Sequence, residues 1–261
     1  MLDLHMHVLP AVDDGAADEY ESHQMLRRWA EFGFTELVAT PHLGGRLSPL
    51  YAAEVSDAFD RTFSVAASLG LTLHTGYEIM LQPDLPDRLE AGEAITLAGS
   101  NAVLVEVPFM HWPAFTEDVI FSIQTAGFRP VLAHPERYLA VQHDPGLALA
   151  LAERGVVMQL TYASLAGGLG RSAQRTAEHL LTADAVIVLA SDAHSEGRRL
   201  LAIPRGIERS IELVGEPRTR QMTFDNARAL LHDEPLPNPA PVEPARSRQG
   251  PLERVKQMIR Q

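Results

Sequence analysis

Residues 186–197 read VIVLASDAHSEG, an apolar run that leads directly into Asp192 and His194. The run has the composition of a buried strand, in which β-branched and small apolar residues fill both faces. Two explanations fit the acid and the imidazole at its end. Either Asp192 caps the next helix while His194 faces water, or both side chains bind a metal ion. The ends of the other strands decide between them.

Short apolar runs alternate with longer amphipathic segments along the chain. The predicted strands are 2–5, 36–40, 71–77, 102–107, 130–134, 156–160 and 185–191. Helical periodicity is found before Gly33 and over 51–69, 116–126, 146–154 and 171–182. Seven strand–helix alternations predict an α/β fold with parallel strands, arranged as a barrel or as an open doubly wound sheet.

The chain of 261 residues has a globular composition, with 46% hydrophobic and 21% charged residues. We expect one domain over 1–232. Residues 233–261 contain six prolines, which predict a Pro-rich linker, and end in a short amphipathic segment, LERVKQMIR. No apolar run reaches the ~18 residues of a membrane span. The first ten residues also lack the features of a signal peptide, so we expect a cytoplasmic protein without membrane insertion.

Charge and missing residue types exclude several kinds of chemistry. A formal net charge of −12 argues against nucleic acid as the main partner. The chain has no cysteine, which excludes thiol nucleophiles and Cys-ligated zinc. Its single lysine, Lys256, lies in the tail, which excludes a Walker-type phosphate loop and a Schiff-base lysine in the core.

Ionisable side chains gather at the ends of the predicted strands. The C-terminal ends of parallel strands meet on one face of the fold, so side chains there lie close together. Candidate metal ligands occur at six of the seven ends: His5, His7, Asp14, His42, Glu78, Glu106, His134, Asp192 and His194. His5 and His7 stand two residues apart in one strand and therefore point to the same side. The strand 156–160 ends without such a candidate.

This set of residues predicts bound cations, because burying so many ionisable groups together with few basic ones is costly. Nine candidates are too many for one ion. A mixture of imidazoles and carboxylates without sulfur suits Mn, Fe or Zn better than Mg or Ca alone. We therefore predict two or three bound divalent metal ions, as in enzymes that hydrolyse phosphate esters. Manganese is the preferred identity, with iron or zinc as alternatives.

Seven motifs occur in order between residues 3 and 194: DLHMHVLPAVDDGA, VATPH, GYEI, LVEVP, LAHPERY, MQLTYASLAGGLG and ASDAH, with FDNARALL following at 224–231. In these motifs the chain resembles the PHP (polymerase and histidinol phosphatase) superfamily. Within it, the chain is most similar to the bacterial metal-dependent tyrosine phosphatases of capsule and exopolysaccharide loci. The resemblance implies a distorted seven-stranded (β/α) barrel of the PHP type, with a trinuclear site at its C-terminal face.

The resemblance also implies how the ligands are divided. One ion would be bound by His5, His7, Glu78 and Asp192. A second ion would be bound by Glu78, Glu106 and His134, and a third by Asp14, His42 and His194. Arg137 matches an arginine that binds the substrate phosphate. Arg199, with Arg198 as the alternative, would be the second such arginine, although the family's Arg-Pro-Pro step is missing here. The TYAS stretch also departs from the family, which would place Tyr162 near the pocket.

The same resemblance implies that the chain would hydrolyse phosphotyrosine in proteins through attack of a metal-bridging hydroxide on phosphorus. His42 or His194 is the candidate general acid. The phosphotyrosine protein would be a bacterial tyrosine kinase, in the control of capsular or exopolysaccharide synthesis, and the phosphatase itself would form a homo-oligomer. For His111, Trp112 and Tyr138, which lie on loops near the same face, packing is favoured over contact with the phenyl ring.

Three alternatives stay open. The same centre would also suit a small phosphate ester, such as a histidinol-phosphate-type metabolite or a nucleotide. An amidohydrolase likewise begins with His-X-His and ends with an aspartate, but usually needs eight strands and often a modified lysine, which this core lacks. A metal-binding scaffold without catalysis is disfavoured by the nearly complete set of ligands.

Overall fold

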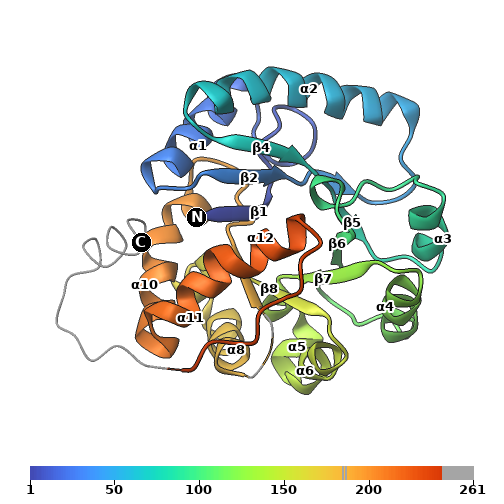
Figure 1. Ribbon diagram of the computed structural model, residues 1–261, viewed down its shortest axis with the longest axis vertical. Helices are drawn as coiled ribbons and strands as arrows, with labels where there is room; N and C mark the ends of the chain where they lie inside the picture. The colour runs from blue at the N-terminus through green and yellow to red at the C-terminus, as the bar shows by residue number, and fades with distance from the viewer. Residues whose placement is uncertain (184, 186, 243–261) are drawn as a thin grey trace.

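The computed structural model describes residues 1–183, 185 and 187–242, and its strands form two sheets (Figure 1). The smaller sheet has the order β1 (Leu2–Met6), β2 (Glu36–Ala39), β4 (Thr72–Thr75). The larger has the order β3 (His42–Leu43), β5 (Glu78–Met80), β6 (Ala102–Glu106), β7 (Arg129–Ala133), β8 (Val157–Thr161), β9 (Ile187–Ala190). Every strand pairing is parallel, which confirms the predicted α/β fold with parallel strands.

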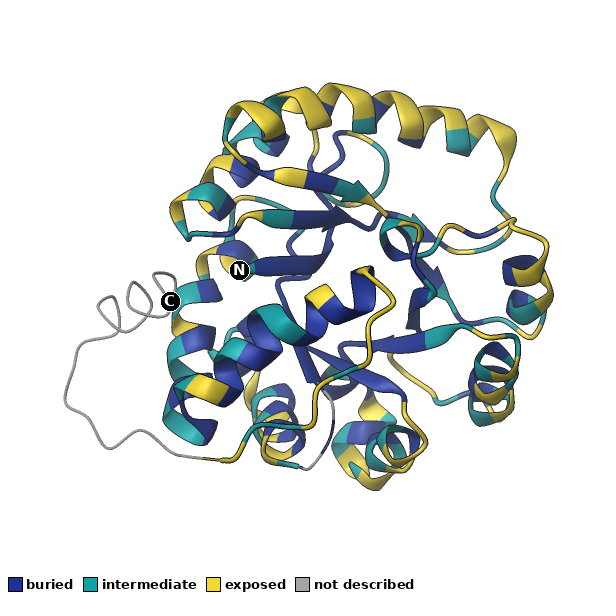
Figure 2. Cartoon of the chain, viewed as in Figure 1, coloured by how far each residue is buried: buried dark blue, intermediate teal, exposed yellow. Residues whose placement is uncertain are grey.

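Helices connect the strands and lie around the sheets, with their exposed residues turned outward (Figures 1 and 2). They are α1 (Glu19–Glu31), α2 (Pro49–Ser68), α3 (Leu85–Glu90), α4 (Thr116–Thr125), α5 (Leu139–His143), α6 (Gly146–Glu153), α7 (Tyr162–Leu165), α8 (Arg171–Thr182), α9 (Arg198–Leu201), α10 (Ile203–Val214), α11 (Glu216–Arg220) and α12 (Asn226–Leu231). Two short 3₁₀ helices, η1 (Leu97–Gly99) and η2 (Pro135–Arg137), and one π-helix, η3 (Gln221–Asp225), complete the described elements. Within the described ranges, no helix combines the length and apolar character needed to cross a bilayer.

Two of the predicted strands, 36–40 and 71–77, correspond to β2 and β4, and each is followed by a short strand that was not predicted, β3 or β5. Pro41, which has no amide hydrogen to donate, separates β2 from β3. Gly76 lies between β4 and β5, where a Cβ atom would come within 3.1 Å of the Val38 side chain and 3.0 Å of the Leu97 side chain. His42 and Glu78 therefore stand on short strands of their own, in the larger sheet.

The two sheets meet along β1 and the end of β9. The backbone amide of Asp192 donates to the carbonyl of His5 at 2.9 Å, and the amide of His7 donates to the carbonyl of Ala193 at 2.9 Å. The predicted single barrel of seven strands is not formed as one continuous sheet, because the strands divide into open sheets of three and six.

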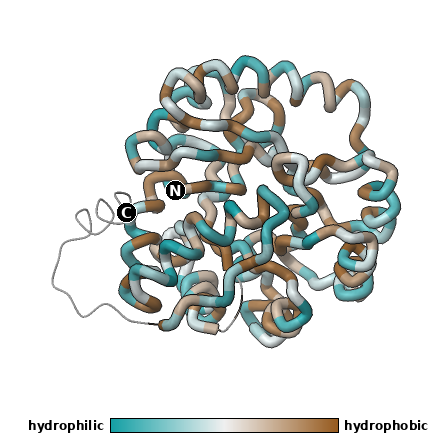
Figure 3. The backbone as a smooth tube through the Cα atoms, in the orientation of Figure 1, coloured by the Kyte–Doolittle hydropathy of each residue, from teal (hydrophilic) through white to brown (hydrophobic). Residues whose placement is uncertain are grey.

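Side chains that face the interior change from apolar to polar along the strands. In β6, Ala102 and Leu104 belong to an apolar cluster, and Glu106 follows on the same face of the strand. In β9, Val188 belongs to the same cluster, and Asp192 follows just beyond the end of the strand. At the opposite end the cluster is closed by α12, through Ala227, Leu230 and Leu231. The base of the interior is thus hydrocarbon, and polar groups collect at the C-terminal ends of the strands. Figure 3 shows the mixture of hydropathies along the backbone, and Figure 1 shows α12 in front of the strands.

The predicted helices 51–69, 116–126, 146–154 and 171–182 agree with α2, α4, α6 and α8 to within two residues at either end. Helices α10, α11 and α12 were not predicted from the sequence. The described part of the Pro-rich segment lies against the domain: the Gln221 side chain donates to the Asn238 carbonyl at 2.7 Å and accepts from the Ala240 amide at 2.6 Å. The predicted amphipathic end of the chain, LERVKQMIR, lies outside the described residues.

Candidate metal centre

A cavity of about 110 Å³ lies at the C-terminal ends of the strands. The residues that line it are Asp14, His42, Glu78, Glu106, Phe109, His134, Arg137, Asp192, His194 and Arg199. His5 and His7 lie directly behind the lining residue Glu78, with their Nε2 atoms 3.1 and 3.2 Å from its carboxylate; both are buried, and their Nε2 atoms are 3.3 Å apart. All nine ligand candidates from the sequence are therefore brought together, and capping of a helix by Asp192 does not account for their arrangement.

Glu78 lies at the middle of this cluster. Its Oε2 atom is 3.1 Å from Nε2 of His5, 3.2 Å from Nε2 of His7 and 3.1 Å from Nδ1 of His42. A fourth imidazole nitrogen, Nε2 of His134, lies 2.7 Å from the other oxygen of the carboxylate. The side chain is completely buried. A buried carboxylate surrounded by four imidazoles is a favourable position for a cation.

The donor atoms fall into three groups, each with all members within 4.8 Å of one another. The groups are His5, His7, Glu78 and Asp192; His42, Glu78 and Glu106; and His7, Asp14, His42 and His194. The first has the same members as the set that the resemblance implies for one ion. The second group differs from the implied set because it contains His42 where the resemblance implies His134. The third group contains His7 in addition to the implied members. His134 contacts Glu78 but lies outside all three groups.

The chemistry of the donors fits divalent cations. Among the described residues at the cavity, carboxylates outnumber guanidinium groups. The carboxylates are those of Asp13, Asp14, Glu78, Glu106 and Asp192, and the guanidinium groups are those of Arg137 and Arg199. Imidazole nitrogens and carboxylate oxygens without sulfur suit Mn, Fe or Zn. Because the groups share members, they have the arrangement needed to hold two or three ions side by side.

Two side chains that the sequence did not single out fix the orientation of the buried imidazoles. Nδ1 of His5 is hydrogen-bonded to Oε1 of Gln159 at 2.8 Å, and Nδ1 of His7 to Oδ2 of Asp13 at 2.7 Å. Each bond keeps the ring proton on Nδ1 and leaves Nε2 available to a cation. A signal was present for Gln159, because it is the one polar residue in the apolar strand 156–160.

We expect Gln159→Leu to weaken Mn²⁺ binding by about 10- to 100-fold. The change removes the acceptor that Nδ1 of His5 shares with the backbone amide of His134. Calorimetric titration of metal-free protein with Mn²⁺ measures the effect. Gln124→Leu is the matched control, because Gln124 also bonds a backbone group, the Arg154 carbonyl, but outside the cavity. Equal Mn²⁺ affinities of Gln159→Leu and the unmodified protein would contradict the assignment.

His134 reaches the cavity through a strained backbone. Val131 and Ala133 of β7 face the interior, so a continued strand would turn His134 away from it. Its φ of 33° instead turns the side chain back toward Glu78. Asp192 has a φ of 50°. Left-handed conformations of this kind cost about 1–3 kcal/mol for residues other than glycine and tend to occur at functional sites.

Two arginines enter the cavity and both bond Asp192. Arg137 donates to Oδ2 of Asp192, and Arg199 donates to the same oxygen at 2.9 Å and to the Asp192 carbonyl at 2.8 Å. Arg198 is exposed and does not line the cavity. Of the two alternatives, the structure therefore brings Arg199 to the centre. Each guanidinium has further N–H donors with which to bind a phosphate.

The expectation that Tyr162 lies near the pocket is wrong. Its side chain is buried in the core, with its ring 6.5 Å from that of Phe34, and it does not line the cavity. The first residue of α7 points into the core because its bulky ring buries more apolar surface there.

The favoured packing role of the loop aromatics agrees with their positions. Tyr138 is buried, and its hydroxyl donates to the Ala133 carbonyl at 2.7 Å. Trp112 packs at an angle against Tyr138, and His111 is exposed. The aromatic side chain at the cavity is instead Phe109, which the sequence did not single out.

In the absence of cations, protons bind at the same imidazoles. Burial lowers the pKa of His5, but the negative charges of Glu78 and Asp192 outweigh burial and raise the pKa to about 9. Burial is likewise outweighed for His7 by its bonds to Asp13 and Glu78, which raise the pKa to about 9. The pKa of His194 falls to about 4 because of burial and the positive charges of His7 and Arg199.

The metal-free protein is therefore expected to become less stable as the pH rises. Protonated His5 and His7 stabilise the folded state fully below pH 6.5, and this contribution is lost as the pH rises through about 9. Thermal unfolding in EDTA should show a Tm that falls over this interval. With saturating Mn²⁺ the protons are displaced, so the same interval should show a smaller fall. A Tm that rises with pH in EDTA would argue against the paired imidazoles.

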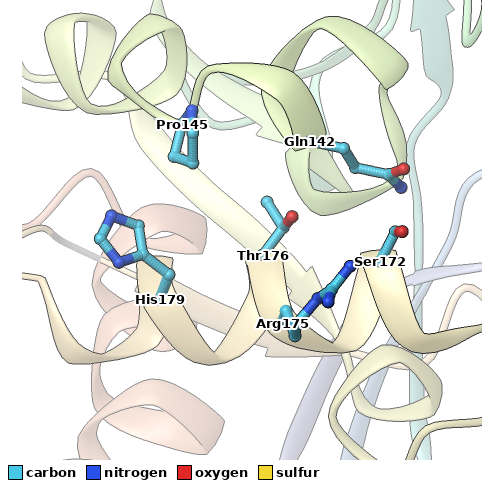
Figure 4. A pocket seen from close by; sticks show the side chains of 6 residues that line it. All are labelled: Gln142, Pro145, Ser172, Arg175, Thr176 and His179. Carbon is cyan, nitrogen blue, oxygen red and sulfur yellow. The ribbon is translucent and has the colours of Figure 1, made fainter.

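A second cavity, of about 260 Å³, lies between α8 and the connection of α5 with α6 (Figure 4). Its lining residues are Gln142, Pro145, Ser172, Arg175, Thr176 and His179. With one imidazole and no carboxylate among these residues, this cavity lacks a set of donors for a divalent cation. The first cavity is therefore the candidate centre.

The family model for capsular polysaccharide synthesis proteins, CpsB/CapC, matches residues 1–232. The chain belongs to the CpsB/CapC family. Among CpsB/CapC relatives, it is 34% identical to tyrosine-protein phosphatase YwqE of Bacillus subtilis (strain 168) over 197 residues, 75% of this chain and 78% of YwqE. It is 24% identical to tyrosine-protein phosphatase CpsB of Streptococcus pneumoniae over 241 residues, 90% of this chain and 99% of CpsB. The motif resemblance is thereby confirmed.

Solved structures agree with the CpsB/CapC assignment. One from work on B. subtilis YwqE and S. pneumoniae CpsB, described as unique metal-dependent tyrosine phosphatases, superposes with a TM-score of 0.81 at 30% identity, covering 93% of this chain and all of that one. A β-aspartyl dipeptidase from Fervidobacterium islandicum AW-1 superposes with a TM-score of 0.54 at 14% identity, covering 94% of this chain and 77% of that one. The second match shows a shared fold and nothing about the reaction.

Proposed function

We propose that this CpsB/CapC protein is a metal-dependent phosphatase that removes phosphate from tyrosine side chains of proteins. The observation that carries the proposal is the arrangement of three overlapping donor groups and two guanidinium groups around one cavity. The substrate is supported by the relatives YwqE and CpsB, which are tyrosine-protein phosphatases.

The proposed ligands are His5, His7, Asp14, His42, Glu78, Glu106, His134, Asp192 and His194, holding two or three divalent ions, with manganese first. When bound there, divalent ions would supply a nucleophile from water at neutral pH and would neutralise charge on the phosphate. Glu78 is fully buried and belongs to two donor groups, so it would contribute to both.

The protein's own side chains bind the phosphate and the leaving group. Arg137 and Arg199 are proposed to hold the phosphate oxygens, for which the planar guanidinium is suited. His42 and His194 are only partly buried, unlike His5 and His7, and so border the open side of the cavity. We assign to His42 the transfer of a proton to the departing tyrosine oxygen, whose conjugate acid has a pKa of ~10. Burial lowers the pKa of His42, but Glu106 and Glu78 outweigh burial and raise it, whereas the pKa of His194 falls to about 4.

We further propose that the two sheets together form one distorted seven-stranded barrel. The hydrogen bonds of Asp192 and His7, which join β1 to the end of β9, support this description. The catalytic domain would span 1–232, with 233–261 as a Pro-rich extension. The family's description supports a role in capsular or exopolysaccharide synthesis. Tyrosine phosphorylation requires ATP, so we place the protein in the cytoplasm. Its proposed partner is a bacterial tyrosine kinase, and it is proposed to act as a homo-oligomer.

Purified protein, stripped of metal and reloaded with Mn²⁺, tests this function on a phosphotyrosine peptide and on histidinol phosphate. We expect kcat/KM to be higher for the peptide by about tenfold or more. EDTA should abolish activity, and elemental analysis should find two or three ions per chain. Turnover of histidinol phosphate without turnover of the peptide would favour the small-molecule alternative.

A further inference from the structure

We infer that Phe109 selects aryl phosphates at this centre, because its ring forms the wall against which the tyrosine ring of the substrate packs. The inference rests on the proposed phosphatase function and specifies how the same site recognises its substrate. Phe109 lines the cavity and is 37% exposed.

Phe109 differs from its neighbours in chemistry. Among the described residues that line the cavity, it has the one hydrocarbon side chain, and all the others are ionisable. Two further exposed apolar residues lie beside it, Met110 at 77% and Leu139 at 38% exposure. The Leu139 amide donates to the Phe109 carbonyl at 3.0 Å, which ties the two segments together. We call these three residues the apolar lip: Phe109 lines the charged cavity, and Met110 and Leu139 are its exposed neighbours outside the lining.

The position of the ring links the lip to the phosphate. The guanidinium carbon of Arg137 lies 4.6 Å from the centroid of the Phe109 ring, and the imidazole of His134 stacks on that ring at 5.3 Å. A phosphate bound by Arg137 therefore carries its ester group next to Phe109. A phenyl group extends far enough to contact the apolar lip, whereas the single methylene of phosphoserine presents little apolar surface.

Phe109 also contacts Arg137, and the two roles have different consequences. Holding Arg137 in place through the cation–π contact would affect every phosphate ester equally. Contact with the substrate ring would affect aryl compounds and spare alkyl ones. The ratio of aryl to alkyl binding therefore separates the inference from a purely positioning role.

The test is calorimetric binding of phenylphosphonate and methylphosphonate to the full-length, Mn²⁺-loaded protein. We expect the unmodified protein to prefer phenylphosphonate. Phe109→Ala should weaken phenylphosphonate binding by about three- to tenfold and methylphosphonate binding by less than about twofold. Phe109→Leu, which keeps apolar volume without the ring, should lie between. Phe63→Ala on α2 is the matched control, since Phe63 is 46% exposed and outside the cavity.

Equal weakening of both phosphonates by Phe109→Ala, or no preference in the unmodified protein, would overturn the inference. Retention of the aryl preference by Phe109→Leu at its full value would also overturn it, because the ring would then be dispensable. A protein that prefers phenylphosphonate through Phe109 but leaves the phosphotyrosine peptide intact would instead disprove the proposed function. The two failures are thus distinguishable.

Discussion

Glu78→Gln is expected to deplete the centre of metal and to lower kcat/KM for a phosphotyrosine peptide by about 10³-fold or more. The substitution keeps the shape of the side chain but removes the negative charge that lies within 3.2 Å of His5, His7 and His42. An amide also cannot accept through both of its terminal atoms, so the contact with His134 or with the other imidazoles is lost. Elemental analysis after gel filtration and steady-state kinetics measure the two effects.

Glu153→Gln provides the control for this experiment. Glu153 is exposed on α6, so its substitution should leave metal content and activity unchanged. Thermal unfolding in EDTA shows whether Glu78→Gln is folded. A folded Glu78→Gln protein that keeps its full complement of ions and activity within tenfold of the original would disprove the central role of Glu78.

Arg137→Ala should lower kcat/KM for the same peptide by about 10²- to 10³-fold while metal content stays the same. The guanidinium belongs to the proposed phosphate contact and is not among the metal-donor groups. Arg137→Lys should recover part of the loss, because it restores the charge but not the planar pair of donors. The measurements are steady-state kinetics and elemental analysis on the same preparations.

Arg199→Ala and Arg198→Ala form a matched pair beside this variant. Arg199 reaches Asp192 in the cavity, and Arg198 is exposed outside it. We expect a loss for Arg199→Ala and activity within about twofold for Arg198→Ala. The opposite order, or loss of metal from Arg137→Ala, would contradict the division between metal-binding and phosphate-binding residues.

The ligand candidates were predictable because strand geometry depends on simple periodicity. An apolar run that alternates inward-facing positions and then ends in an acid, as before Glu106 and Asp192, places that acid at the edge of the interior. The parallel arrangement followed from the alternation of strand and helix. The motifs then supplied the family, which the match over 1–232 confirms.

Other features depend on contacts between distant segments, and local patterns do not contain them. The pairing of Gln159 with His5 joins residues far apart in sequence. The turn that directs His134 inward requires an unfavourable φ that no propensity favours. Loop aromatics are equally ambiguous, because the sequence does not show which side of a loop faces the cavity. Phe109 was therefore missed. Tyr162 was expected near the pocket because the TYAS stretch departs from the family, but its side chain lies in the core.

The closure of the interior by α12 has a consequence for synthesis of the protein. This helix, the last in the described chain, packs onto Leu2 and Leu4 of the first strand, and Asp192 bonds the backbone of His5. Contacts between the two ends of a chain form late, because a large loop must close before they can stabilise anything. While the residues beyond about 190 are still inside the ribosome, the emerged part of the chain lacks the helix that fills the base of the interior. It also lacks a complete set of metal-donor side chains. Metal uptake is expected to be among the last events in the maturation of the protein.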